Sequence, residues 1–266
     1  YENTLKAIHK NFDWLYNTIT PDDKKTFKMV CAGKTDGMFQ IESDMMKGLI
    51  SDIQPTTIND LSALIAIGRP GPLSYGTDKM FAEQKRDPTK RKKILPNVDD
   101  IVARSYGCII YQEDIMMISK RIAGFDDGQS DSLTRKTLAK KKASMLPILR
   151  RCLIYGKKNC IGPKGWEEDD NAPWYDQKGK YGGEIPGAVS NGYDAKEVDD
   201  FFHDIQGFAS YCFNLGHSLA YSFLVLISAY LKAHYPVPYM ASVLSMQTDD
   251  KKKEKYMKVC EDMEIK

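Results

Sequence analysis

The spacing of apolar residues along the chain predicts a mainly helical protein. Between Thr57 and Gly68, apolar side chains recur at helical intervals, and Thr57 is a residue type that caps helix starts. A similar start is predicted at Thr20, where a proline and two acidic residues follow. The segment 69–72, Arg-Pro-Gly-Pro, must end the helix that begins at Thr57, so Arg69 is held at a rigid break.

The last quarter of the chain continues the helical pattern. Residues 218–234 are apolar nearly all round, which predicts a buried helix ended by Pro236 and Pro238. Residues 249–266 form a charged amphipathic helix. The longest apolar run, 218–231, contains three serines and is shorter than the roughly 20 residues of a membrane span. We therefore expect no membrane association.

The middle of the chain mixes a short strand, a helix and a basic loop. Residues 107–111 are β-prone, and residues 112–122 then place apolar side chains on one helical face. Residues 85–93 hold six bases and one acid. Such a loop is either simply solvated or faces phosphate groups.

A second basic segment is more unusual. Residues 132–158 carry nine bases and no acid, and Asp131 or Ser132 can cap a helix at its start. Like charges on one helical face destabilise an isolated helix, and a solvated helix normally intersperses acids. The segment therefore favours a polyanionic partner.

Residues 162–197 differ from everything before them. Ten glycines and prolines fall within these 36 positions, and Glu167–Asp170 supplies four consecutive acids. We interpret this stretch as an irregular insertion with short turns or a hairpin.

Overall composition adds few constraints. The chain has 266 residues, 42% hydrophobic and 28% charged, with a net charge of +2, which is ordinary for a globular protein and excludes wholesale disorder. Six cysteines form no CxxC pair, so we read them as reduced thiols of a cytoplasmic protein. The chain starts at Tyr1 without a signal-like segment, and we expect it to be part of a longer protein.

The sequence contains binding groups but no self-contained catalytic motif. A Walker phosphate loop and a GxSxG elbow are absent, and no spacing brings two of the four histidines together as metal ligands. Paired carboxylates lie near element boundaries, where capping explains them. Taken alone, Asn214 is best explained as a helix cap and His217 as a satisfied core residue.

Six segments, in order along the chain, resemble the C family of bacterial replicative DNA polymerases, the alpha subunit of DNA polymerase III. The segments are 36–43 (DGMFQIES), 60–73 (DLSALIAIGRPGPL), 106–116 (YGCIIYQEDIM), 133–142 (LTRKTLAKKK), 213–222 (FNLGHSLAYS) and 231–236 (LKAHYP). The resemblance covers most of the chain and points to the fingers domain, which is largely helical in this family.

This resemblance implies a function and also what the chain lacks. Fingers domains of the family bind the incoming dNTP and help to hold the template–primer. The three aspartates that bind Mg²⁺ in this family belong to the palm, which precedes the matched region. The resemblance therefore implies no catalytic or metal-binding residue here, and a fragment that is inactive alone.

The resemblance also assigns residues. Arg135 and Lys136 match a pair of bases that contacts the triphosphate, although Lys136 replaces an arginine and offers a point charge instead of a bidentate fork. The remaining nucleotide-binding candidates are Lys140, Tyr111, Gln112, Asn214, His217, Tyr221 and Arg69, the last being either structural or nucleotide-facing. The DNA-binding candidates are Lys141, Lys142, Lys92 and Lys93.

The expected organisation has three parts: fingers residues 1–161, the insertion 162–197 and fingers residues 198–266. Leu215 and Gly216 stand where the family has lysine and serine, and the insertion is long, which indicates a divergent bacterial or phage member. Expected partners are DNA, dNTP, a sliding clamp and other replisome subunits. The alternative is a non-catalytic nucleic-acid-binding module, with a small-molecule enzyme a remote third possibility.

Overall fold

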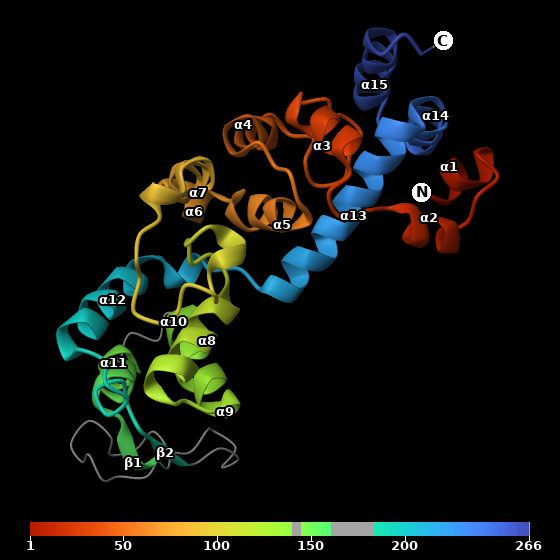
Figure 1. The fold of residues 1–266 in the computed structure, drawn as a ribbon. Coiled ribbons are helices and arrows are strands. Elements are labelled where there is room, and N and C mark those ends of the chain that lie inside the picture. The colour runs from red at the N-terminus through yellow and green to blue at the C-terminus, as the bar shows by residue number, and fades with distance from the viewer. Residues whose placement is uncertain (140–144, 161–182, 266) are drawn as a thin grey trace. The chain divides into compact units, whose positions relative to one another are not determined.

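The computed structural model describes residues 1–139, 145–160 and 183–265. The candidates Lys140, Lys141 and Lys142 and most of the predicted insertion lie outside this part of the chain. The described residues are mainly helical, which confirms the expected fold class (Figure 1). The chain divides into two compact units, one formed by Tyr1–Leu73 with Gly216–Lys266 and the other by Ser74–Leu215.

The first unit joins the two ends of the chain in one helical core. From the beginning of the chain come α1 (Glu2–Ala7), α2 (Phe12–Thr18), α3 (Lys24–Cys31), α4 (Asp44–Ile53) and α5 (Ile58–Ile67). From the end come α13 (Leu215–His234), α14 (Pro236–Met246) and α15 (Asp250–Asp262). Leu5 and Leu15 share a buried cluster with Leu231, Tyr239 and Met240, so burial of apolar side chains ties the termini together.

Local capping explains where several of these helices begin. Thr57 caps α5 as expected, and Asp60 completes a capping box by accepting the backbone amide of Thr57. The predicted start at Thr20 was wrong by one turn: α3 begins at Lys24, and Asp23 is its cap. Pro236 starts α14 instead of only ending α13, because proline is tolerated in a first turn.

The helix α13 is longer than the apolar run in the sequence. It has 20 residues, so the expectation that it is too short to cross a membrane does not hold by length and composition. Of the most apolar 18-residue stretch of this helix, 56% is buried within the protein. Lys232 inside it is 1% exposed and donates hydrogen bonds to the carbonyls of Lys34 and Asp36. Those features are typical of a core helix.

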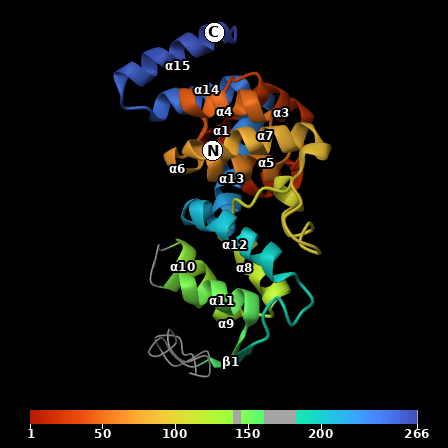
Figure 2. The same cartoon turned by 90° about the vertical axis from the view of Figure 1, so that its left-hand side faces the viewer.

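The second unit is built from short helical pieces and one small sheet. Its elements are α7 (Thr77–Arg86), η1 (Pro88–Lys90), η2 (Ala103–Ser105), α8 (Gln112–Ala123), α9 (Asp127–Gln129), η3 (Ser130–Arg135), α10 (Lys136–Ala139), α11 (Leu146–Tyr155), β1 (Lys157–Cys160), β2 (Gly183–Ile185), α12 (Ala195–Phe208) and η5 (Ala209–Tyr211). The short helix α6 (Pro70–Ser74) spans the boundary between the units. Helix α11 packs on α8, α10 and α12, and both views show α8, α10 and α11 grouped together (Figures 1 and 2).

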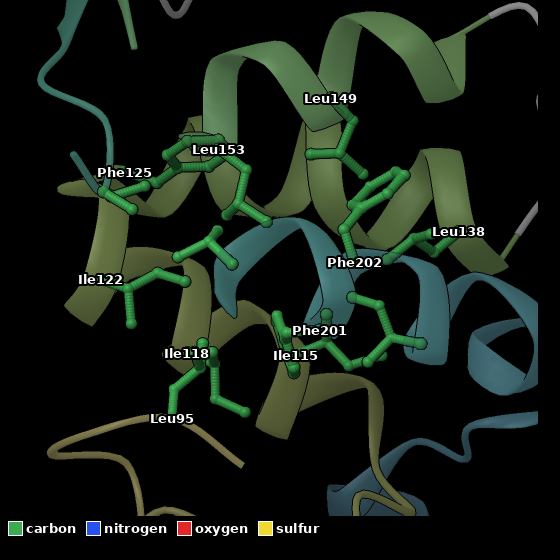
Figure 3. Close-up of a cluster of buried hydrophobic side chains, with 14 of the residues drawn as sticks. Leu95, Ile115, Ile118, Ile122, Phe125, Leu138, Leu149, Leu153, Phe201 and Phe202 are labelled. Atoms are coloured by element: carbon green, nitrogen blue, oxygen red, sulfur yellow. The ribbon is translucent and has the colours of Figure 1, made fainter. Parts of the chain in front are cut away.

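One hydrophobic cluster holds these pieces together. Phe201 and Phe202 of α12 lie among Leu149 and Leu153 of α11 and Ile115 of α8 (Figure 3). All five side chains are less than 9% exposed. Burying each of them contributes on the order of 1.5–3 kcal/mol, so this cluster positions α8 relative to the helices around it.

The strands are not where the sequence placed them. The β-prone run 107–111 forms no strand, and only Tyr111 pairs there, as an isolated parallel bridge with Phe213. The antiparallel pair has β1 just before the residues assigned to the insertion and β2 within them, where short turns or a hairpin were expected. Ile185 and Ala188, which belong to the predicted insertion, are buried in the main cluster, and α12 begins at Ala195.

Candidate functional site

The basic helix starts earlier than expected and contains a π-helical turn. The N-terminal cap is Asp126, and not Asp131 or Ser132. Asp126 and Gln129 form a capping box, in which the side chain of each accepts a hydrogen bond from the backbone amide of the other. The chain then continues through α9, the π-helical η3 and α10 without a break. Wider π-helical turns inside helices are frequent at functional sites.

Arg135 and Lys136 lie side by side around one carboxylate. Asp131 accepts a short hydrogen bond from Arg135 Nε, and Lys136 Nζ lies 3.2 Å from its other oxygen. The hydrogen bond from Arg135 is the largest of the effects that hold the pKa of Asp131 below its ordinary value. The side chains of Arg135 and Lys136 are 34% and 38% exposed, so both cations remain accessible from solvent.

A buried hydrogen bond attaches this turn to α8. The hydroxyls of Ser119 and Thr134 lie 3.0 Å apart, and both residues are 2% exposed. Ser119 also donates to the carbonyl of Ile115. Because a buried hydroxyl without a partner is costly, this pair fixes the rotation of η3 against α8.

Glu113 connects the beginning of α8 to the segment that leads into α13. Its two carboxylate oxygens accept hydrogen bonds from Asn214 Nδ2 at 2.7 Å and from the Leu215 backbone amide at 2.8 Å. Asn214, directly before α13, is therefore a donor to Glu113, and its expected role as a helix cap stays a prediction. The charge of Glu113 also helps to raise the pKa of Arg135, after the larger effect of Asp131.

Gln112 belongs to the same junction. Its side chain donates to the carbonyl of Cys212 at 3.2 Å, and its backbone amide donates to the carbonyl of Phe213 at 2.9 Å. Tyr111 precedes it but is only 2% exposed, with the Arg104 guanidinium 5.7 Å from the centre of its ring. Tyr111 is thus part of the support of the junction and does not present its side chain to solvent.

The remaining nucleotide-binding candidates lie in the first unit. The rings of His217 and Tyr221 are 4.1 Å apart between centroids, and Phe39 lies 5.5 Å from Tyr221. His217 is exposed, so its interpretation as a core histidine was wrong. Arg69 donates from Nε and Nη2 to the carbonyl of Ala66, at the end of α5, which gives this guanidinium a structural contact.

The concentration of positive charge is partly offset in three dimensions. Arg150 makes a two-pronged ion pair with Asp199 of α12, at 2.5 and 2.6 Å. Together with Arg135 and Lys136, at least three of the nine bases counted at 132–158 have a carboxylate partner. Lys92 and Lys93 of the other basic segment are exposed.

The described residues do not assemble a metal centre. Among residues 1–139, 145–160 and 183–265, no group of three or more histidine, cysteine or acidic side chains could hold a metal ion. Five cysteines in this part of the chain are free thiols, as expected: Cys31, Cys108, Cys152, Cys212 and Cys260.

The second unit therefore holds two sets of contacts: Asp131 binds Arg135 and Lys136, and Glu113 binds Asn214 beside Gln112. The link between the two sets is the electrostatic effect of Glu113 on Arg135. Sequence reasoning missed the roles of Asp131 and Glu113, and also Phe39 in the first unit. An acid four residues before Arg135 is a recognisable pairing signal. The contact between Glu113 and Asn214 spans 101 positions and has no such signal.

The fold and the site together define the class of protein as a helical domain with a pair of accessible cations. Comparison with known proteins also identifies a domain. Residues 2–159 match the model of the bacterial DNA polymerase III alpha subunit finger domain. The chain is 33% identical over 231 residues to the DNA polymerase III subunit alpha of Aquifex aeolicus, covering 87% of the chain and 17% of the relative. It is 31% identical over 271 residues to that of Saccharopolyspora erythraea, covering 99% of the chain and 20% of the relative.

The chain belongs to the bacterial DNA polymerase III alpha subunit finger-domain family. A third relative, from Treponema pallidum, is 34% identical and covers 88% of the chain. The chain spans about a fifth of the length of the curated relatives that it matches.

Proposed function

We propose that the chain is the fingers portion of a bacterial or phage replicative DNA polymerase alpha subunit, in which it binds the incoming dNTP and the template–primer. The parent protein would then be a DNA-directed DNA polymerase. The observation that carries the proposal is the accessible pair Arg135 and Lys136 on Asp131, together with the junction of Gln112, Glu113 and Asn214, because these residues come from three of the segments that resemble the family.

Within that function, Arg135 and Lys136 contact the triphosphate of the dNTP. A guanidinium presents several donors in a fixed plane and an ammonium adds a compact charge, so together they favour a polyphosphate over a neutral ligand. Asp131 orients both groups. The π-helical turn and the Ser119–Thr134 hydrogen bond hold this arrangement against α8.

The other candidates take supporting roles in the proposal. Gln112 and Asn214 line the same junction, and Tyr111 stabilises it from the buried side. His217, Tyr221 and Phe39 offer ring faces on which a base can stack. Lys140 joins the triphosphate contacts, while Lys141 and Lys142 contact DNA, as do Lys92 and Lys93 through the backbone phosphates.

The Mg²⁺ ions of such a polymerase do not fit the described residues of this chain, which bring no set of three potential ligands together. As the family resemblance implies, the proposal places the metal ligands in a palm domain elsewhere in the parent protein. The fingers contribution is electrostatic positioning of the dNTP, and the chain by itself is expected to be inactive.

The test is Arg135→Ala in the full-length protein, with primer extension measured over a range of dNTP concentrations. Loss of a charged contact to phosphate should raise KM for dNTP by about 10- to 100-fold. Arg150→Ala is the matched control, because it also breaks an Arg–Asp ion pair in the same unit. Equal effects of the two substitutions, or no effect of the first, would contradict the assignment.

The alternative is a nucleic-acid-binding module without a role in nucleotide selection. It is favoured by the exposed bases Lys92 and Lys93 and predicts strongly salt-dependent DNA binding. A dNTP complementary to the template should strengthen DNA binding of the full-length protein only under the polymerase proposal. Under the alternative, dNTP leaves the affinity unchanged at every salt concentration.

The polymerase proposal also implies where the parent protein acts and which proteins it binds. Replication of bacterial DNA takes place in the cytoplasm, and the parent protein would meet a sliding clamp and other replisome subunits there. Free cysteines are compatible with that reducing compartment.

A further inference from the structure

The second unit contains a cavity apart from the cationic cluster. Its volume is about 550 Å³, and it lies between α7, the segment 92–96 and α12. The floor is apolar and includes Leu95, Ile109, Phe201 and Ile205, which also belong to the main hydrophobic cluster. The cavity is therefore lined in part by the hydrophobic core of the unit, and its size is that of a ligand site.

One wall of the cavity holds an amide whose oxygen is buried without a hydrogen-bond partner among the described residues. This amide belongs to Gln84 of α7, which is 2% exposed. A buried amide left unpaired is costly and rare in folded proteins. A half-turn of the terminal torsion exchanges its oxygen and nitrogen, so Gln84 can offer an occupant either a donor or an acceptor.

The backbone beside this amide is shaped to leave room for it. Gly107 has φ +94°, and a Cβ on it would lie 2.9 Å from the Gln84 amide oxygen. Only glycine combines this conformation with such a close approach. The neighbouring Arg91 lies over the Tyr106 ring, 5.4 Å from its centroid, and so anchors the segment that carries Lys92 and Lys93.

The rim carries opposite charges on opposite sides. Glu197, Asp200 and Asp204 follow helical spacing along one face of α12, and all three are exposed. Lys92 and Lys93 line the other side. No salt bridge joins these lysines to those acids within the described residues.

We propose that this cavity binds a short extended segment of a partner protein, with apolar side chains between one basic and one acidic residue. The apolar side chains fill the floor, and a peptide group hydrogen bonds with Gln84. The basic residue faces α12 and the acidic residue faces Lys92 and Lys93. This partner site is independent of dNTP binding.

Peptide chemistry explains the three observations together. A peptide group has both a donor and an acceptor, so it can pair with the amide oxygen of Gln84. Apolar anchors in a preformed pocket supply most of the affinity of such contacts, and charges on the rim select the partner. Phosphates of DNA inside the cavity would lie against the three carboxylates of α12, which is repulsive, so DNA can contact Lys92 and Lys93 only from outside the cavity.

The experiment uses the full-length protein with ¹³C-labelled isoleucine δ-methyl groups and short capped peptides. The probes are acetyl-Lys-Leu-Phe-Glu-amide, the reversed order acetyl-Glu-Leu-Phe-Lys-amide and the uncharged acetyl-Gln-Leu-Phe-Gln-amide. At least one charged peptide should shift the methyl signals of Ile94, Ile109 and Ile205. Ile50 and Ile227 belong to the core of the first unit, and their signals should stay in place.

Two substitutions test the recognition. Gln84→Leu keeps the wall filled and removes the amide, and it should weaken binding of the charged peptide about tenfold. Asp204→Asn should weaken it about three- to tenfold, whereas Asp99→Asn, an exposed acid outside the cavity, should not. Because Asp204 is on the surface, Asp204→Asn tests peptide recognition even if the buried substitution Gln84→Leu disturbs folding.

The proposal is overturned if neither charged peptide moves the cavity signals, or if the uncharged peptide binds as tightly as they do. It is equally overturned if Asp204→Asn and Asp99→Asn have the same effect. Primer extension serves as a separate readout, because the Gln84 and Asp204 substitutions should leave KM for dNTP unchanged.

Discussion

Two carboxylates, Asp131 and Glu113, organise the residues of the candidate site. Asp131 holds Arg135 and Lys136 within the same helical turn, and Glu113 holds Asn214 and the start of α13. Neither acid is suited to contact a triphosphate. Each instead restricts the rotamers of a donor, which lowers the entropy lost when a ligand binds.

Asp131→Asn tests this positioning role at the scale of a single residue. The amide cannot hold two cations as a carboxylate does, so we expect KM for dNTP to rise about three- to tenfold with a smaller change in kcat. The effect should be weaker than that of Arg135→Ala. Steady-state primer extension by the full-length protein provides the measurement.

The control is Asp199→Asn, which releases Arg150 from a comparable ion pair on α12. It should leave KM for dNTP unchanged. A KM that falls in Asp131→Asn would show that the carboxylate competes with the triphosphate and does not orient its ligands.

At the scale of elements, the contact between the end of α11 and the segment after β2 depends on glycine. Gly156 has φ +75°, and a Cβ on it would lie 2.2 Å from the carbonyl oxygen of Ile185. Gly187 has φ +82°, and a Cβ on it would lie 2.2 Å from the Gly156 amide nitrogen. Its own amide donates to the carbonyl of Ala123, so this contact also secures the end of α8.

Gly156→Ala should therefore be severely destabilising, by more than about 3 kcal/mol, because the backbone itself must move. Gly192→Ala is the control: it also has positive φ, +88°, but has no atom within 4 Å of the added Cβ. We expect that change to cost only about 1 kcal/mol. Urea denaturation of the two variants compares them, and equal losses would contradict the steric explanation.

The helix boundaries show how far local sequence rules reach. The capping box at Thr57 and the charged final helix were predicted correctly, since each depends on residues within one turn. The basic helix began five residues before the predicted cap at Asp131, at Asp126. Local sequence rules make Asp126 and Asp131 equally suitable as cap residues. The packing of η3 on α8 determines that the helix begins at Asp126.

For the whole molecule, stability should depend on pH through a lysine in the core of the first unit. Burial lowers the pKa of Lys232 from 10.5 to about 8. Between these values the unfolded chain holds the proton that the folded chain has lost, so stability rises with pH. From about pH 7 to about pH 9 the gain from this lysine should be about 1.3 kcal/mol.

Lys232→Met should abolish this rise, which denaturation of the chain across the pH range would reveal. Substitution of the exposed Lys28 by Met should leave the rise intact. Cys108 and Tyr239 work in the opposite direction above about pH 9 and pH 10, because burial raises the pKa of both, so the series must stop near pH 9. A slope that persists in Lys232→Met would assign the dependence to another group.

The sequence by itself determined the helical class, the family and the pairing of Arg135 with Lys136, because periodicity and ordered motifs are local properties of the chain. It also indicated free thiols correctly for the five cysteines described. The structure alone decided which side chains are accessible: Tyr111, a nucleotide-binding candidate through the family resemblance, is buried, and His217, interpreted as a core residue, is exposed. Burial depends on residues far away in the sequence, as the contacts of Glu113 and Arg150 with positions 101 and 49 residues distant show. For the same reason, a concentration of nine bases became partly neutralised, and a cavity lined by α7 and α12 emerged from segments that are unremarkable when read separately.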